Sequence, residues 1–67
     1  MPNVEVYEKD EMNALFQGDF PFLPRLGETI SKEMGGYFNY YNVVEIWHRE
    51  VGETGFFQAC VRVKIDD

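Results

Sequence analysis

The last ten residues before the C-terminal pair of aspartates alternate strictly between apolar and polar side chains. From Phe56 to Ile65 the odd positions 57 to 65 are all apolar, while positions 58, 62 and 64 are polar. Successive side chains of a strand point to opposite faces, so this pattern predicts a β-strand with one face on a core and the other in water. Any fold for this chain must therefore place the odd residues of this strand on the core.

A second long strand is expected over Phe38–Arg49, which is rich in aromatic and β-branched residues. The segment Val51–Gly55 that joins the two strands has the composition of a hairpin turn. A four-residue loop at 51–54 puts the even residues of the first strand beside the odd residues of the second. The expected pairs are Glu50 with Gly55, His48 with Phe57, Ile46 with Ala59, Val44 with Val61 and Asn42 with Val63. A slip by one residue would bury Arg62 and Lys64, so the hydrophobic pattern specifies this register.

A shorter strand is expected over Glu28–Lys32, before this hairpin, and either of two turns can join it to the long strand. A two-residue turn at 35–36 sets Ile30 opposite Tyr41 on the outer face, whereas a three-residue loop at 35–37 gives inner-face pairs. Those inner-face pairs are Ile30 with Asn42 and Met34 with Phe38. We favour the three-residue loop because it sets apolar side chains on the inner face.

The N-terminal third predicts a first strand and one short helix. Asn3–Glu8, with Val4 and Val6 alternating, is expected to form a strand that pairs with the last one, since the short strand at 28–32 suits an exposed edge. Asp10 is a suitable cap for a helix over Glu11–Gln17, with Gly18 as its stop. A helix this short is not stable alone, so its apolar side must pack on the sheet. Residues 20–24 should be extended, because two of them precede prolines.

These elements predict a single domain over residues 1–67 of a mainly β (α+β) class. The expected architecture is a small, partly open barrel or a curled four-stranded antiparallel sheet with one short helix near the N-terminus. Two motifs carry a resemblance, namely Pro24-Arg25-x-Gly27-Glu28-x-Ile30 and Tyr41-x-Val43-Val44-x-Ile46. Over about residues 23–48 the chain resembles the small SH3-like β-barrels of short, uncharacterised bacterial and phage proteins. The resemblance implies a fold and a bacterial or phage source, and it implies no activity.

Composition limits the cellular compartment and the class of partner that we expect. Twelve acidic against six basic side chains give a net charge of −6, which disfavours a general nucleic-acid binder because Lys and Arg carry phosphate binding. The single cysteine, Cys60, allows no internal disulfide and suits a reducing compartment. No apolar run approaches the ~20 residues of a membrane span, and residues 1–10 lack the order of a signal peptide. We therefore expect an acidic, cytoplasmic protein with no membrane partner.

The residues that carry chemistry are too isolated to predict catalysis. His48 and Glu50 share a strand face, but two ligands without companions make no metal site, and a half-buried, hydrogen-bonded histidine is favoured. Cys60 should lie opposite Glu45, whose charge raises a thiol pKa, so a packing role is favoured over a nucleophilic one. The carboxylates are dispersed along the chain, so they do not form the buried acid pair that hydrolysis needs. Gly35-Gly36 lacks the neighbouring residues of a phosphate-binding loop. We expect no enzyme, no catalytic residue, no metal and no cofactor.

The outer face of the long hairpin is the predicted binding surface. Its register gathers aromatic and basic side chains, which is the composition of interface hot spots. The candidate binding residues are Tyr41, Trp47, Arg49, Phe56, Arg62 and Lys64, with Val43 beside them. We expect a protein partner, with self-association and acidic mimicry of nucleic acid as special cases. Two alternatives remain: the same strip could stack and bind nucleic acid, or Trp47 and Tyr41 could form a second small core under the helix or residues 20–24.

Overall fold

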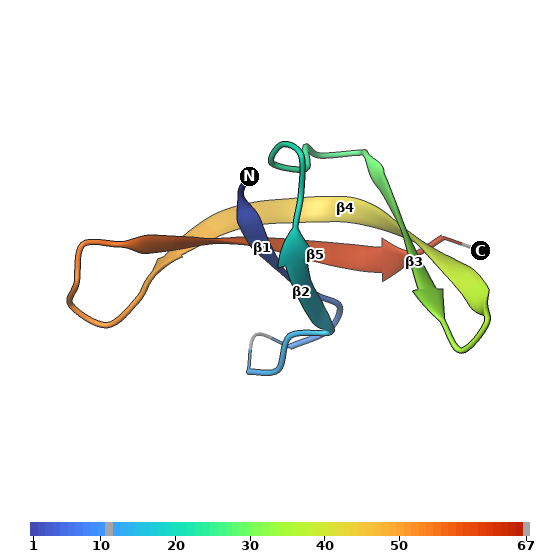
Figure 1. The fold of residues 1–67 in the computed structure, drawn as a ribbon, viewed down its shortest axis with the longest axis horizontal. Coiled ribbons are helices and arrows are strands. Elements are labelled where there is room, and N and C mark those ends of the chain that lie inside the picture. Colours follow the sequence, from blue (N-terminus) through green and yellow to red (C-terminus); the bar gives the residue numbers. More distant parts are fainter. Residues whose placement is uncertain (11, 67) are drawn as a thin grey trace.

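The computed structural model describes residues 1–10 and 12–66, which form one curled, half-barrel sheet of five strands (Figure 1). The strands are β1 (Asn3–Tyr7), β2 (Phe16–Asp19), β3 (Thr29–Met34), β4 (Tyr37–Glu50) and β5 (Phe57–Ile65). Their order across the sheet is β2-β1-β5-β4-β3. The mainly β class and the partly open barrel are confirmed, whereas the expected four strands are five. Within the described residues no helix is long and apolar enough to cross a membrane.

The expected helix at residues 11–17 is wrong. Glu11 lies outside the described residues, residues 12–15 form bends and Phe16 and Gln17 belong to β2. Asp10 does accept hydrogen bonds from the backbone N–H groups of Met12 and Asn13, at 3.0 and 3.1 Å, but these close a tight turn. A seven-residue helix nucleates poorly, whereas pairing with β1 satisfies the backbone and turns Phe16 onto the core.

β1 pairs with β5 as expected, but the pairing is parallel, so the expectation of an antiparallel sheet is wrong for this pair of strands. Its valines Val4 and Val6 lie beside Ala59 and Val61, so both strands turn their apolar side chains to the same concave face. The parallel step is possible because β1 and β5 are the two most distant strands in sequence, with the rest of the chain as the connection.

The β4–β5 hairpin turns one residue later than expected. The backbone N–H of Val51 donates to the carbonyl of Phe56 at 2.9 Å, which leaves residues 52–55 as the loop. The register therefore pairs Glu50 with Phe57, and the expected pair Glu50–Gly55 is wrong by two residues. Even β4 residues still lie beside odd β5 residues near the turn, so the faces are preserved there: His48 pairs with Ala59, and Ile46 with Val61.

A β-bulge at Val44 reverses the faces in the first half of β4. Glu45 pairs with Arg62 and Val43 pairs with Val63, which leaves Val44 as the extra residue. The expected pairs of Val44 with Val61 and Asn42 with Val63 are therefore wrong. Tyr41 and Val43, expected on the outer face, lie in the core.

The β3–β4 turn is the two-residue alternative, so the favoured three-residue loop is wrong. Met34 pairs with Tyr37, and Gly35 and Gly36 between them have φ values of 64° and 94°. Two positive φ angles define the tight hairpin turn that glycine favours. Ile30 pairs with Tyr41 and still packs on the core, because the bulge has turned Tyr41 inward.

The core lies on the concave face of the sheet. Its fully buried members come from β1, β4 and β5, and partly buried side chains from β2, β3 and residues 20–23 close over it. The buried set is Val4, Val6, Tyr41, Val43, Val61 and Val63, and the surrounding set is Phe16, Phe20, Leu23, Ile30, Ile46 and Ala59. The expected extended segment at 20–24 therefore acts as a cover for the open side of the half-barrel.

Candidate protein-interaction surface

The structure separates the six predicted binding residues instead of gathering them in one patch. Tyr41 is 2% exposed, and its ring packs against Phe16 with centroids 6.1 Å apart. Trp47, Arg49 and Arg62 lie on the convex face, which is the face of the sheet opposite the core. Phe56 lies beside the hairpin loop, and Lys64 is exposed near the other end of β5, opposite Asn42.

Trp47 is half-buried on the convex face, where its ring contacts Tyr7 and Arg62. Its ring centroid lies 5.4 Å from that of Tyr7, and the guanidinium of Arg62 lies 5.2 Å from the centre of its ring. Arg62 is itself held by Glu45, with Nε 2.7 Å from Oε1, and by the carbonyl of Lys9, to which it donates at 3.2 Å. The second small core anticipated for Trp47 is thus formed in part, by β1 and Arg62 and not by residues 20–24.

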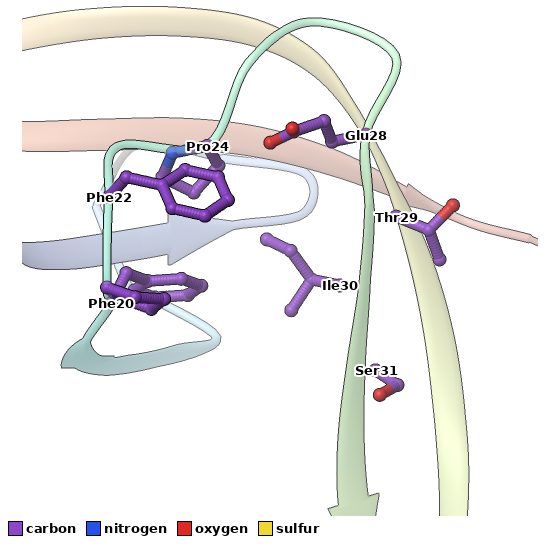
Figure 2. A pocket seen from close by; sticks show the side chains of 8 residues that line it. Phe20, Phe22, Pro24, Glu28, Thr29, Ile30 and Ser31 are labelled. Carbon is purple, nitrogen blue, oxygen red and sulfur yellow. The ribbon is translucent and has the colours of Figure 1, made fainter.

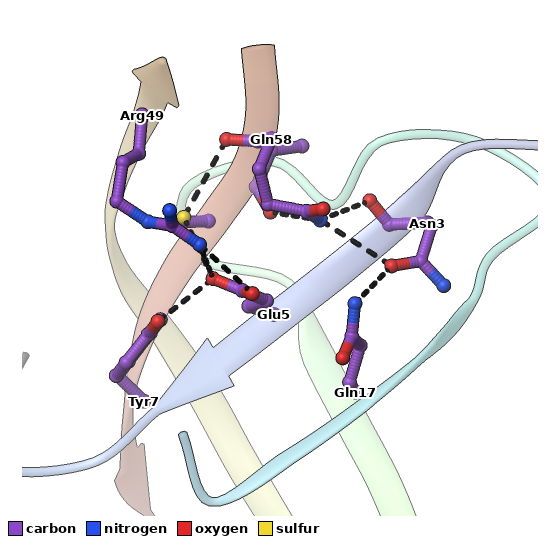
Figure 3. Close-up of polar contacts among 8 residues, drawn as sticks. Asn3, Glu5, Tyr7, Gln17, Arg49 and Gln58 are labelled. Carbon is purple, nitrogen blue, oxygen red and sulfur yellow. Dashed lines mark hydrogen bonds and ion pairs between the residues drawn. The ribbon is translucent and has the colours of Figure 1, made fainter. Parts of the chain in front are cut away.

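Glu5 is the centre of a polar network beside this contact (Figure 3). Its carboxylate accepts hydrogen bonds from Arg49 Nη2 at 2.8 and 3.0 Å and from the hydroxyl of Tyr7 at 2.7 Å. The thiol of Cys60 lies 3.5 Å from the same carboxylate. Burial opposes ionisation of Glu5, but the hydrogen bonds from Arg49 and Tyr7 outweigh it and lower the Glu5 pKa.

The same network disfavours ionisation of its neutral members. The hydrogen bond to Glu5 raises the pKa of Tyr7, with burial adding to it. Burial raises the pKa of Cys60, and Glu5 adds to that rise. The direction expected for Cys60 is therefore right, while the carboxylate responsible is Glu5 and not Glu45, because the shifted register sets Cys60 opposite Trp47.

A second set of polar contacts extends this network to the edge of the sheet. Gln58 Nε2 donates to the carbonyl of Asn3 at 2.8 Å, and Gln17 Nε2 donates to the side-chain oxygen of Asn3 (Figure 3). Within the described residues no buried side-chain nitrogen or oxygen lacks a partner. The polar groups here thus hydrogen-bond to one another, so this part of the convex face contributes to the fold.

The hairpin tip, residues 50–57, is the most exposed apolar feature near the predicted site. Phe56 is 75% exposed, Phe57 64% and Val51 45%. Figure 1 shows the β4–β5 hairpin extending well past the other strands, so no neighbouring strand covers either face of its tip. Large exposed apolar side chains that gather at one place indicate an interaction site.

Three side-chain hydrogen bonds hold the tip loop in one conformation. The hydroxyl of Thr54 donates to the carbonyl of Val51 at 2.7 Å and accepts from the N–H of Phe56 at 3.1 Å. The N–H of Gly55 donates to the carboxylate of Glu50 at 3.0 Å. The exposed Phe56 is therefore presented on an ordered support.

The charge at the tip is negative. Glu50 and Glu53 are its only ionisable side chains, and the nearest base, Arg49, is paired with Glu5. The exposure of Phe57 was not predicted, because the expected register set Phe57 on the core, and Val51 was counted as part of the loop. The signal available in the sequence was the pair Phe56-Phe57 directly after Gly55, which no alternating pattern can bury on both faces.

His48 is exposed and lies opposite Ala59, so its expected half-buried position beside Phe57 is wrong. In the described part of the chain no three His, Cys, Asp or Glu residues gather as metal ligands would.

Comparison of the chain with protein-family models, with curated proteins and with solved structures finds no match.

Proposed function

We propose that this chain is a small acidic, non-enzymatic interaction domain of the cytoplasm that binds a protein partner through its hairpin tip. The observation that carries the proposal is the pair of exposed phenylalanines, Phe56 and Phe57, on a protruding and internally hydrogen-bonded loop. Aromatic side chains that enter a partner's pocket supply most of the energy of typical protein interfaces.

The ordered loop supports this proposal through its effect on affinity. A flexible loop loses conformational entropy when a partner fixes it, and that loss subtracts from the binding free energy. The bonds of Thr54 and Glu50 fix the loop before binding. An aromatic pair on a preorganised hairpin should therefore bind more tightly than the same pair on a mobile segment.

The negative charge of the hairpin tip indicates the kind of residue at the rim of the partner's pocket. The tip carries Glu50 and Glu53 and no base, and the whole chain carries −6. Complementary charge accelerates association and suppresses wrong partners. The expected partner surface is an apolar pocket with Lys or Arg at its rim.

The nucleic-acid alternative has less support. Two of its three expected cations, Arg49 and Arg62, are engaged by the carboxylates of Glu5 and Glu45. A stacking platform needs an open aromatic face, and Trp47 has Tyr7 and Arg62 against its ring.

The test replaces both phenylalanines of the tip by serine and measures capture of the native partner from a lysate of the source organism. Phe56→Ser with Phe57→Ser should reduce capture at least about tenfold, because each lost aromatic anchor costs ~1–2 kcal/mol or more. The matched control is Phe38→Ser, which removes a phenylalanine that is 57% exposed at the far end of β4 and should leave capture unchanged.

Both variants should keep the parent's thermal unfolding midpoint, since both sites are exposed. Equal capture by the double variant and the parent would reject the tip as the binding site. Binding to oligonucleotides that survives in the double variant and disappears on charge reversal of Arg62 and Lys64 would favour the nucleic-acid alternative instead.

A further inference from the structure

The outer edge of β3 runs along an apolar groove at the open side of the half-barrel. The groove has a volume of about 230 Å³ and lies between β3 and residues 20–24. Figure 2 shows Ile30 pointing from β3 toward Phe20, Phe22 and Pro24 across it. β3 is the last strand in the sheet order, so no other strand within residues 1–10 and 12–66 pairs with this edge.

The ladder between β3 and β4 determines which backbone groups of β3 face the groove edge. The N–H of Val43 donates to the carbonyl of Glu28 at 2.9 Å, in the same register that pairs Ile30 with Tyr41. Hydrogen-bonded pairs alternate along an antiparallel ladder, so the even residues of β3 bond to β4. The backbone N–H and C=O groups of Thr29, Ser31 and Glu33 therefore point to the free edge.

These edge groups have no backbone partner from elsewhere in the described chain. None of the backbone hydrogen bonds found there outside the strand ladders involves Thr29, Ser31 or Glu33. An edge of this kind is a template for another strand, and proteins that do not use such an edge usually block it with a bulge, a proline or inward-pointing charges. The ladder of β3 is regular over all six residues and holds no proline. Its one inward-pointing charge is Lys32, whose ammonium donates to the carbonyl of Glu33 at 3.4 Å, and this is the one edge group to which it hydrogen-bonds among the described residues.

We propose that the free edge of β3 and its groove form a strand-addition site for an extended segment of a partner protein. The groove is smaller than the ~300–1,000 Å³ of typical small-molecule sites, so it fits one apolar side chain better than a cofactor. The row of backbone groups beside it is matched by another backbone, as in β-augmentation. This site is separate from the hairpin tip, which Figure 1 shows at the opposite end of the sheet from β3.

The faces of β3 define the chemistry of the occupant. An added strand continues the alternation of β3, so its residues opposite Ile30 enter the groove and its residues opposite Glu33 lie on the convex side. Glu33 is exposed there, and its charge matches Lys or Arg. Lys32 points to the other side, where its ammonium lies 5.7 Å from the centre of the Phe16 ring. The occupant is therefore an extended segment with apolar and basic residues in alternation.

The probe for this site is a capped heptapeptide of alternating Lys and Val, titrated into the intact chain and followed by NMR. Binding should slow hydrogen exchange at the amides of Thr29, Ser31 and Glu33 and leave the amides of Ile30 and Lys32 unchanged. Two further peptides carry N-methyl groups on every Lys amide or on every Val amide. One of them should lose binding at least about tenfold and the other should retain it, because only alternate amides face β3.

A variant of the chain provides the reciprocal test. Ser31→Pro removes an N–H that faces the free edge, so the β4 ladder stays complete and the fold should persist. This variant should bind the Lys–Val probe at least about tenfold more weakly, whereas Ser31→Ala, which keeps the N–H, should bind as the parent does.

Three results would overturn the proposal: no probe binding at millimolar concentration, unchanged binding by Ser31→Pro, or equal binding of both N-methylated peptides. The N-methylated pair decides the matter on the parent chain if Ser31→Pro does not fold. The variant Phe56→Ser with Phe57→Ser should bind the probe normally, so failure of this site and failure of the hairpin tip are distinguishable.

Discussion

Val43 lies directly opposite Val63 in the β4–β5 ladder, although the register at the other end of the hairpin would set Val43 opposite Lys64. The difference of one residue is absorbed by the bulge at Val44. Its consequence is that Tyr41 and Val43 enter the core while Val44 becomes 41% exposed. This bulge decides which aromatic side chains remain available for binding.

Aspartate at two neighbouring positions tests the bulge. Val43→Asp places a carboxylate in the core without a partner, at a cost of several kcal/mol against a total stability of ~5 kcal/mol, so it should unfold the domain. Val44→Asp changes an exposed residue and should cost ~1 kcal/mol or less. Thermal unfolding followed by circular dichroism distinguishes the two. A cooperative transition in Val43→Asp and none in Val44→Asp would show that the regular register is correct and the bulge is wrong.

Trp47→Ala should lower stability more than it lowers partner binding. The indole contacts the ring of Tyr7 and the guanidinium of Arg62, and such aromatic and cation–π contacts contribute ~0.5–2 kcal/mol each in addition to burial. We expect a loss of ~2 kcal/mol in the free energy of urea unfolding. Partner capture per folded molecule should stay near that of the parent. A large loss of capture with unchanged unfolding would restore Trp47 as the binding anchor.

The alternation of apolar and polar residues predicted which segments form strands better than it predicted which residues pair between the strands. The strand at residues 56–65 and the long strand before it were predictable, because burial of one face leaves a period-two signal. The pairing of the first strand with the last was predictable because the short strand at 28–32 suits an exposed edge. The bulge at Val44 was not, since three consecutive residues, Asn42, Val43 and Val44, fit either face. The likeness to SH3-like barrels over residues 23–48 stays a prediction.

Local signals misled where tertiary pairing supplied more energy. Asp10 and the spacing of Met12, Leu15 and Phe16 are typical of a capped helix, but β1 pairs with residues 16–19, and the carbonyl of its Val6 accepts from the N–H of Leu15. The residues of the predicted binding strip are separated in the structure for a related reason. Its composition was correct, while the face of each member depended on a register that a loop shift and a bulge both changed.

Cys60 should react slowly with iodoacetamide at pH 8 in the folded protein. Its side chain is fully buried, and burial together with Glu5 raises its pKa, so the thiolate is scarce and poorly accessible. In urea the rate should rise to that of an unstructured thiol. Glu5→Gln removes the nearby charge without opening the strand and should accelerate the reaction only modestly. A folded-state rate equal to the rate in urea would contradict the buried position.

The network around Glu5 should make stability fall at both ends of the pH scale. The Glu5 pKa is lowered from its usual 4.5, so the unfolded chain binds the proton more readily, and the stability that Glu5 contributes above pH ~4.5 is lost as the pH falls. The pKa values of Tyr7 and Cys60 are raised from 10.0 and 9.0, so their contribution is complete below pH ~9 and is lost above it. Unfolding free energy should therefore be nearly constant from pH ~5 to 8.

Glu5→Gln tests how much of the fall in unfolding free energy at low pH comes from Glu5. The Glu5 side chain is only 15% exposed, so loss of its charged hydrogen bonds should cost ~1 kcal/mol or more at pH 7. The difference from the parent should shrink as the pH falls from 7 to 3, because protonation of Glu5 in the parent removes the same charge. Glu45→Gln is the matched control, because its side chain is 54% exposed beside Arg62 and its ion pair should contribute little. Urea unfolding of the three proteins at pH 3, 5 and 7 measures both effects. Equal and pH-independent losses in the two variants would show that Glu5 is no more than another surface carboxylate.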